Sequence, residues 1–137
     1  MASIAYKYYS KVLGQHVDAQ IFLPSMTLTD ARKTPDEIRL SNQRRFKTLV
    51  LLHGYSSSAD AWMRFSQMEL FGEDKNLAII CPAGGVGHYT DWKVGQQWLT
   101  YLQKEFLPAM RATFPLSDRR EDTFVGGLSM GGYGACK

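Results

Sequence analysis

The chain has 137 residues, of which 45% are hydrophobic and 12% aromatic, and this content is typical of a folded globular protein and not of a disordered one. Its net charge of +3 comes from scattered basic residues, so no nucleic-acid partner is expected. The sequence shows no secretion-type leader and no apolar run long enough to span a membrane, which predicts a cytoplasmic protein without a membrane partner.

The first part of the chain predicts an antiparallel hairpin followed by a polar segment. Residues 4–12 and 17–23 have the aromatic and β-branched content of strands, with 13–16 as the turn between them. Residues 25–45 are rich in Thr, Asp, Arg and Pro, and they are too polar to form part of a core. We expect a polar surface insertion there, with a helical turn that starts at Pro35.

From residue 46 onward, predicted strands and helices alternate. Short apolar runs at 46–52, 77–81 and 123–126 are typical of buried strands. Strands that alternate with helices form a mainly parallel sheet, because each helix carries the chain back to the end at which the next strand starts. The sequence therefore predicts an α/β fold that opens with an antiparallel hairpin.

Two helical segments are expected between these strands. Ser57 or Ser58 can cap the first segment, in which the apolar residues follow helical spacing. The second segment is long and begins at about Lys93. Because Pro108 lacks a backbone N–H, we expect a kink at this residue or a break just before it.

The pentapeptide Gly127-Leu128-Ser129-Met130-Gly131 follows the last predicted strand and matches the G-x-S-x-G nucleophile elbow. This strand-to-helix turn strains the backbone of the serine, and bulky residues at Gly127 and Gly131 would collide with the adjoining strand and helix. Ser129 is therefore the candidate catalytic nucleophile of a serine hydrolase. The alternative is that Ser129 is only a small residue in a glycine-rich turn.

His53-Gly54-Tyr55 follows the strand predicted at 46–52 and is placed where such hydrolases form half of the oxyanion hole. The N–H of Tyr55 is expected to supply one donor, and the N–H of Met130 the other. His53 and Gly54 are candidates for lining the substrate pocket. His53 could instead act as the base, but a base must lie within about 3 Å of the nucleophile, which the end of a strand does not ensure.

Tyr89, Asp91 and Trp92 follow a glycine-rich loop at the carboxyl end of the strand predicted at 77–81. Ligands bind at this end of the strands in open α/β sheets, so the three residues are candidates for lining the pocket. Alternatively, Asp91 caps the next helix and Trp92 packs against its first turn. His88, in the same loop, is interpreted as a solvated residue near the rim of the site.

Neither a metal nor a cofactor is expected. The His, Cys and carboxylate residues do not have the spacing of metal ligands. The loop at 84–87 also lacks the lysine and hydroxyl residue of a phosphate-binding loop. Cys81 and Cys136 are far apart and are expected to be reduced thiols.

Four segments together resemble the esterase D family of α/β-hydrolases, which includes S-formylglutathione hydrolases, and are most similar to the small bacterial tributyrin-type esterases. These segments are 51–55, 89–92, 114–117 and 126–135. The resemblance implies a single α/β-hydrolase domain, an acyl-serine mechanism, and short-chain acyl esters or thioesters as substrates. Family members continue past the elbow helix to supply an acid and a histidine. The resemblance therefore identifies residues 1–137 as the N-terminal part of such a domain, truncated after the elbow.

Three functions remain open. The favoured one is a serine carboxylic ester hydrolase whose partner is a small-molecule ester or thioester. The same elbow also serves acyltransferases, which transfer the acyl group to an acceptor other than water. The third is a noncatalytic truncated fragment. Without the acid and the histidine, we expect the 137-residue chain alone to be inactive, and its association into a homo-oligomer is left open.

Overall fold

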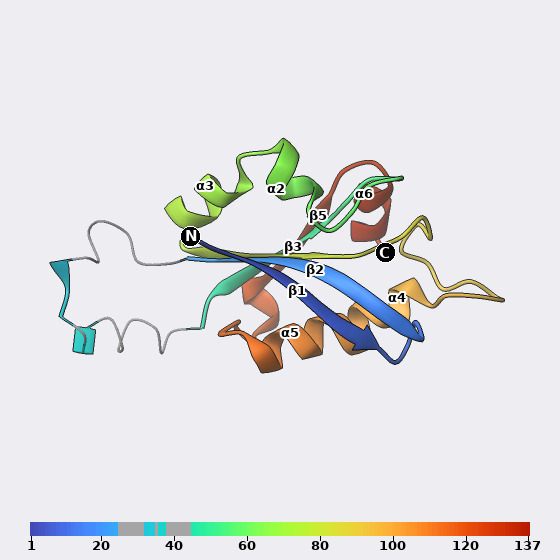
Figure 1. Cartoon of the computed structure of the whole chain (residues 1–137), viewed down its shortest axis with the longest axis horizontal. Helices are drawn as coiled ribbons and strands as arrows, with labels where there is room; N and C mark the ends of the chain where they lie inside the picture. The colour runs from blue at the N-terminus through green and yellow to red at the C-terminus, as the bar shows by residue number, and fades with distance from the viewer. Residues whose placement is uncertain (25–31, 35, 38–44) are drawn as a thin grey trace.

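The computed structural model describes residues 1–24, 32–34, 36–37 and 45–137. Its central feature is a five-stranded sheet with the strand order β1-β2-β4-β3-β5 (Figure 1). The strands are β1 (Ala2–Ser10), β2 (Gln15–Leu23), β3 (Lys47–Leu52), β4 (Leu77–Pro82) and β5 (Thr123–Gly127). The expected polar insertion at 25–45, with its helical turn, lies outside the described residues apart from 32–34, 36–37 and Arg45.

The sheet is mixed, and only β2 runs against the direction of the other four strands. β1 and β2 form the predicted antiparallel hairpin, with Ala2 opposite Leu23 and Ser10 opposite Gln15. β2 also pairs antiparallel with β4. β3 lies between β4 and β5 and is parallel to both. The predicted combination of an N-terminal hairpin and a parallel sheet is confirmed.

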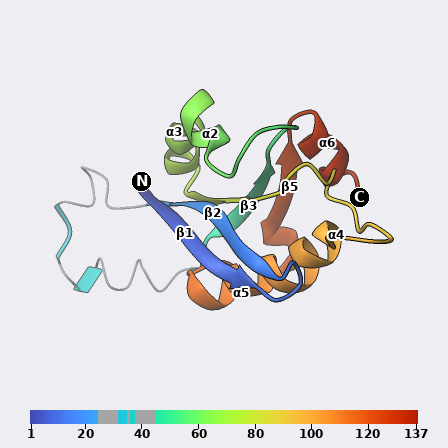
Figure 2. The same cartoon turned by 45° about the vertical axis from the view of Figure 1, so that its right-hand side comes forward.

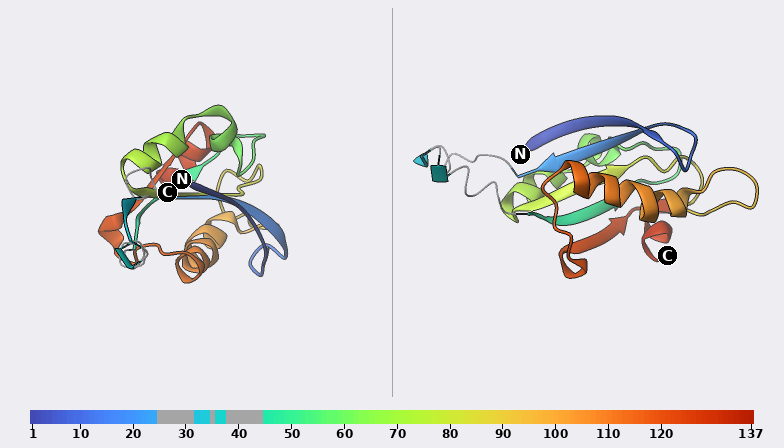
Figure 3. Two further views of the ribbon diagram at one scale, coloured as in Figure 1. Left: turned by 60° about the vertical axis from the view of Figure 1, so that its left-hand side comes forward. Right: turned by 90° about the horizontal axis from the view of Figure 1, so that it is seen from below.

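Helices cover both faces of the sheet, as Figures 2 and 3 show. On one face, α2 (Ala61–Phe65) and α3 (Met68–Asp74) cover a small apolar cluster that contains Ile79 and Cys81 of β4. On the other face, alternate residues of the same strand, Ala78 and Ile80, belong to the larger cluster. The long helical segment after β4 packs against this larger cluster, so β4 is covered on both faces and is apolar along its whole length.

The first helical segment differs from the prediction, because it is divided into α2 and α3 at Ser66, whose backbone is extended. Neither Ser57 nor Ser58 caps it. The residue at the N-cap of α2 is Asp60, which makes no side-chain cap hydrogen bond. The hydroxyl of Ser58 donates to the Asp60 carboxylate instead, and the Ser58 carbonyl accepts from the N–H of Ala61 at 3.1 Å.

The second helical segment begins at Trp98, so the predicted start at Lys93 is wrong. It comprises α4 (Trp98–Thr100), the π-helical η2 (Tyr101–Phe106) and α5 (Leu107–Thr113). Residues 91–97 form a turn instead, closed by a bridge between Asp91 and Gln97, with Gly95 at φ +123°. The irregularity expected before Pro108 is present, since η2 ends there and Pro108 occupies the first turn of α5, where no N–H is needed.

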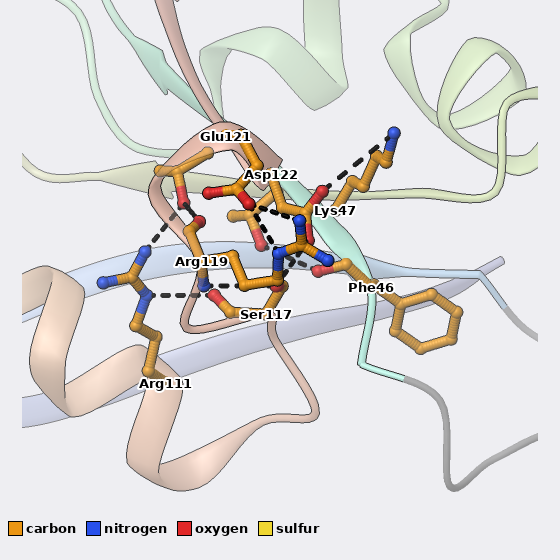
Figure 4. Close-up of polar contacts among 9 residues, drawn as sticks. Phe46, Lys47, Arg111, Ser117, Arg119, Glu121 and Asp122 are labelled. Atoms are coloured by element: carbon orange, nitrogen blue, oxygen red, sulfur yellow. Dashed lines mark hydrogen bonds and ion pairs between the residues drawn. The ribbon is translucent and has the colours of Figure 1, made fainter.

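A polar network fixes the turn that leads into β5 (Figure 4). The hydroxyl of Ser117, which is buried, donates to Asp122 of η3 (Arg120–Asp122) at 2.7 Å, and its N–H donates to the carbonyl of Phe46 at 2.8 Å. Arg111 donates to the Ser117 carbonyl at 3.1 Å and to the Thr123 hydroxyl at 2.7 Å. These bonds hold the start of β5 beside β3, and the pairing of the two strands then determines the position of the residues after β5.

Among the helices of the described residues, none combines the length and the apolar character that a membrane span requires.

Candidate active site

Ser129 lies between β5 and α6 (Met130–Ala135), at the turn from strand to helix (Figure 2). Its backbone has φ 55° and ψ −115°, a region that residues other than glycine seldom adopt. Such a conformation costs on the order of 1–3 kcal/mol and persists only where the surrounding structure imposes it. The side chain is exposed. This is the strained turn that the nucleophile elbow requires.

Two glycines impose this turn. A Cβ added to Gly131 would lie 2.6 Å from the carbonyl carbon of Leu52 and 2.8 Å from the carbonyl oxygen of His53. A Cβ on Gly127 would lie 2.8 Å from the carbonyl oxygen of Leu52 and would also collide with the backbone of Gly131. These are backbone atoms, which cannot move aside as a flexible side chain can. The predicted collisions at Gly127 and Gly131 are therefore confirmed.

Pairing of β3 with β5 brings the two predicted halves of the site together. Leu52 is opposite Gly127, and the N–H of Leu128 donates to the carbonyl of Leu52 at 3.3 Å. Because β3 and β5 are parallel, their carboxyl ends lie at the same end of the sheet. The segment after β3 therefore runs beside the elbow. A Cβ on Gly54 would lie only 3.8 Å from the Cβ of Ser129.

His53 holds this segment in place and is unsuited to act as a base. The N–H of Gly84 donates to its Nε2 at 2.9 Å, so Nε2 carries no proton. The proton is then on Nδ1, which donates to the carbonyl of Gly54 at 2.8 Å. Burial lowers the pKa of the imidazole, and the bond to Gly54 opposes that shift in part. The ring is thus held neutral, with both nitrogens engaged.

The backbone N–H groups of Tyr55 and Met130 are the candidate oxyanion donors. Within the described part of the chain, neither group donates a hydrogen bond to another residue. Met130 is at the first position of α6, where helix geometry leaves N–H groups unpaired. Its side chain is buried in the larger apolar cluster, which anchors the helix. Both N–H groups are therefore without a competing acceptor among the described residues, and their role as oxyanion donors stays a prediction.

A pocket of about 330 Å³ opens at Ser129. It is lined by His53, Gly54, Tyr55, Ser57, Ala61, Trp62, Phe65, Ser66, Leu128 and Ser129. His53 and Gly54 therefore line this pocket, and the expectation that it receives the substrate stays a prediction. The contribution of α2 was not foreseen. The sequence did contain a signal for this contribution. The helix that follows the candidate oxyanion segment carries Trp62 and Phe65 one turn apart.

Tyr89 requires a correction, because it does not line this pocket. Its ring is fully buried, and a Cβ on Gly134 would lie 2.6–2.8 Å from it. Its hydroxyl donates to the carbonyl of His53 at 3.0 Å. Burial raises its pKa above the ordinary range. Tyr89 supports the candidate oxyanion segment through this hydrogen bond, and its buried ring lies outside the lining of the pocket at Ser129.

Asp91 and Trp92 also lie away from the pocket at Ser129. Asp91 accepts hydrogen bonds from the N–H of Thr100 at 3.0 Å and from its hydroxyl at 2.7 Å, so it caps the first turn of α4, as in the alternative interpretation. Trp92 is half exposed and lines a separate pocket of about 180 Å³ with Trp98. The long loop between β4 and α4 carries both residues past the edge of the site.

His88 lies at the rim, with its exposed ring between two tyrosines. The ring centroids are 5.7 Å from Tyr55 and 6.4 Å from Tyr133. Among the described residues that line the pocket at Ser129, His53 is the sole histidine. No group of three or more His, Cys, Asp or Glu side chains in the described residues could hold a metal ion.

Serine hydrolases of the α/β class carry their nucleophile on a strained turn of this kind, between a parallel strand and a helix. The family model for esterases, described as "Putative esterase", matches residues 10–137 of this chain. The chain therefore belongs to this esterase family. An acetyl esterase from Caldicellulosiruptor saccharolyticus is 31% identical over 138 residues, covering 100% of this chain and 50% of the relative.

Two solved structures from Staphylococcus aureus agree with this assignment. The fluorophosphonate-binding serine hydrolase F (FphF) is 32% identical with a TM-score of 0.81, and the S-formylglutathione hydrolase FrmB is 32% identical with a TM-score of 0.77. Each comparison covers 97% of this chain and 49% of the other chain. The chain thus spans about half the length of these relatives. The α/β-hydrolase fold and the esterase family indicated by the sequence motifs are confirmed.

Proposed function

We propose that this chain carries the nucleophile and the oxyanion hole of a serine carboxylic ester hydrolase. The observation that carries the proposal is the strained backbone of Ser129, together with two nearby N–H groups that donate to no other described residue. Strained backbone at residues other than glycine clusters at active sites, where the surrounding structure imposes it. The exposed hydroxyl is free to meet a substrate, and the fixed N–H groups can stabilise the charge that develops on the carbonyl oxygen.

In this mechanism the Oγ of Ser129 attacks the acyl carbon and passes its proton to a base. The carbonyl oxygen becomes an oxyanion that accepts hydrogen bonds from the N–H groups of Tyr55 and Met130. The bond to the alcohol or thiol then breaks, and the leaving group takes up the proton. Water releases the acid from the acyl-serine by the same steps in reverse order.

His53 is excluded as the base by its two occupied nitrogens. We therefore propose that the base and the carboxylate that orients it are supplied from outside the described residues. The lengths of the relatives support this proposal, since each is about twice as long as the part matched here. The 137-residue chain alone is then expected to have little activity.

The proposed substrates are short-chain acyl esters or thioesters. Two relatives support this class by name, one as an acetyl esterase and one as an S-formylglutathione hydrolase. We also propose a reducing compartment such as the cytoplasm, because Cys81 and Cys136 are both free thiols.

Labelling with a fluorophosphonate tests the nucleophile in the longest natural protein that carries this sequence. We expect the probe to attach to Ser129 and to be lost in Ser129→Ala. The matched control is Ser57→Ala, which removes another hydroxyl from the same pocket and should leave labelling intact. Attachment to Ser57, or labelling that persists in a folded Ser129→Ala variant, would refute the proposal.

A further inference from the structure

The walls of the pocket at Ser129 are apolar, and their apolar surface is exposed. Phe65 is 81% exposed, Leu128 65% and Tyr55 58%, and all three line this pocket together with Trp62. Large apolar side chains that gather around one hollow mark a binding surface, whereas isolated exposed ones carry no such meaning. A pocket of about 330 Å³ is much larger than the two carbons of an acetyl group require.

The pocket is suited to only one side of the ester bond. A leaving alcohol needs a proton donor beside it, and a group that titrates near neutral pH is the usual donor. Among the lining residues in the described part of the chain, His53 is the sole histidine, and both of its nitrogens are engaged. The proton then comes from the base that we propose lies outside the described residues, and the leaving group is expected beside that base and not against the described lining of this pocket. The acyl group needs none, because it stays attached to Ser129.

We infer that this pocket binds the acyl group and that it selects apolar acyl chains longer than acetyl. Trp62 and Phe65 of α2 line it together with Leu128, which is next to the nucleophile. The inference rests on the proposed function and extends it from the reaction to the class of acid. Burial of each further methylene against these side chains improves binding by about fourfold.

The three tryptophans of the chain provide a test that needs no activity. Trp62 lines the acyl pocket, whereas Trp92 and Trp98 line the separate pocket described above. Octanoate, the free acid of a medium-length acyl chain, is titrated into the ¹⁵N-labelled longer natural protein and compared with acetate. We expect octanoate to move the indole signal of Trp62, assigned with Trp62→Phe, and acetate at the same concentration to leave it unchanged. The signals of Trp92 and Trp98 should not move with either acid.

Phe65→Ala and Phe71→Ala form a matched pair of variants. Both side chains are exposed, on α2 and α3 respectively, but only Phe65 lines the pocket. Phe65→Ala should weaken octanoate binding by about fivefold to tenfold, and Phe71→Ala should have no effect. A Trp62 signal that ignores octanoate, or equal effects of the two variants, would overturn the inference.

Turnover by the longer protein separates this inference from the proposed function. Phe65→Ala should lower kcat/KM for p-nitrophenyl octanoate about fivefold to tenfold relative to the acetate ester. Acetate esters of longer alcohols should be unaffected, and a change confined to that alcohol series would overturn the inference. A different result would refute the proposed function alone. In that case the protein would show neither ester turnover nor labelling at Ser129, but octanoate would still bind at Trp62, as the inference about the pocket requires.

Discussion

The carbonyl oxygen of Leu52, at the end of β3, accepts the N–H of Leu128, and its carbonyl group faces the Cα of Gly131 so closely that a Cβ there would overlap it. One peptide group of β3 therefore fixes the entry to the nucleophile turn and also excludes a side chain at its exit. The conformation of Ser129 between these two points follows from packing against a neighbouring strand as well as from its own sequence.

Gly131→Ala should consequently destabilise the fold strongly, by about 2–3 kcal/mol in the free energy of unfolding, or should prevent folding. The methyl group would have to displace the backbone of Leu52 and His53. Gly126→Ala is the matched control, since its Cβ would make an ordinary contact at 3.6 Å with the Leu51 side chain. Urea denaturation followed by circular dichroism measures both. Equal stability of the two variants would contradict the steric account.

The sequence was sufficient to predict the elbow, because the constraint is local and has a fixed spacing. Gly127, Ser129 and Gly131 lie within five residues, and an apolar strand precedes them. The hairpin and the central strands were predicted for the same reason, since alternation and apolar runs are local patterns. The predicted start of the second helical segment was wrong. Gly95 adopts a backbone conformation that helices exclude, and the spacing of the apolar residues does not reveal this conformation.

The role of Tyr89 could not be predicted, since its surroundings come from distant parts of the chain. Gly84 and Gly134 create the space for its ring, and the carbonyl of His53 accepts its hydroxyl. In sequence, an aromatic residue after a glycine-rich loop equally indicates a pocket wall. The same limit applied to Phe65, whose helical spacing suggests a core residue although the side chain is exposed beside Ser129.

Ser129→Gly should stabilise the protein, whereas Ser129→Ala should not. Both remove the nucleophile, and in the longer protein turnover should fall about a millionfold. Only glycine relieves the strain of φ 55°. Glycine also gives the unfolded chain more conformational entropy, which opposes this gain. We expect the net effect of Ser129→Gly to be an increase of about 1 kcal/mol in the free energy of unfolding. Thermal and urea unfolding of the two variants side by side would show it. Equal stabilities would mean that the turn is not strained.

Gly54 provides a test of the oxyanion segment. Its Cβ would point at the elbow, 3.5 Å from the carbonyl oxygen of Leu128 and 3.8 Å from the Cβ of Ser129. Gly54→Ala should therefore fold normally, whereas the branched side chain of Gly54→Val should displace the N–H of Tyr55 and reduce turnover in the longer protein about a hundredfold. Steady-state kinetics of the two variants distinguishes these effects. An unchanged kcat in Gly54→Val would place the oxyanion hole elsewhere.

The buried His53 makes stability depend on pH. Its folded-state pKa lies below that of the unfolded chain, so the unfolded chain binds the proton more readily. The stabilisation is complete above the unfolded pKa, about 6.5, and is lost as the pH falls from there through the folded-state pKa. Urea unfolding between pH 8 and pH 5 should show this loss, and His53→Gln should reduce the dependence. His88→Gln, at an exposed ring, is the control and should keep the dependence of the parent.

The exposed edge at β5 predicts how the isolated 137-residue chain behaves. Within the described residues β5 pairs only with β3, and Phe124 and Val125 are 46% and 53% exposed. Beside them lies an apolar pocket of about 430 Å³, formed with the long helical segment and with α6. An unpaired strand edge with apolar side chains is a template for association with another chain. We therefore expect the isolated chain to self-associate. The homo-oligomer that we propose is this association of isolated chains.

Val125→Lys places a charge on this edge and should shift the isolated chain toward monomer in sedimentation experiments. Val94→Lys is the matched control, because Val94 is 90% exposed in the loop before α4 and should leave association unchanged. Ester turnover by the isolated chain should stay near background in both variants, since its described residues place no free base beside Ser129. A parent chain that is monomeric and turns over esters rapidly would contradict both expectations, and the exposed His88 at the rim would then be the base to test.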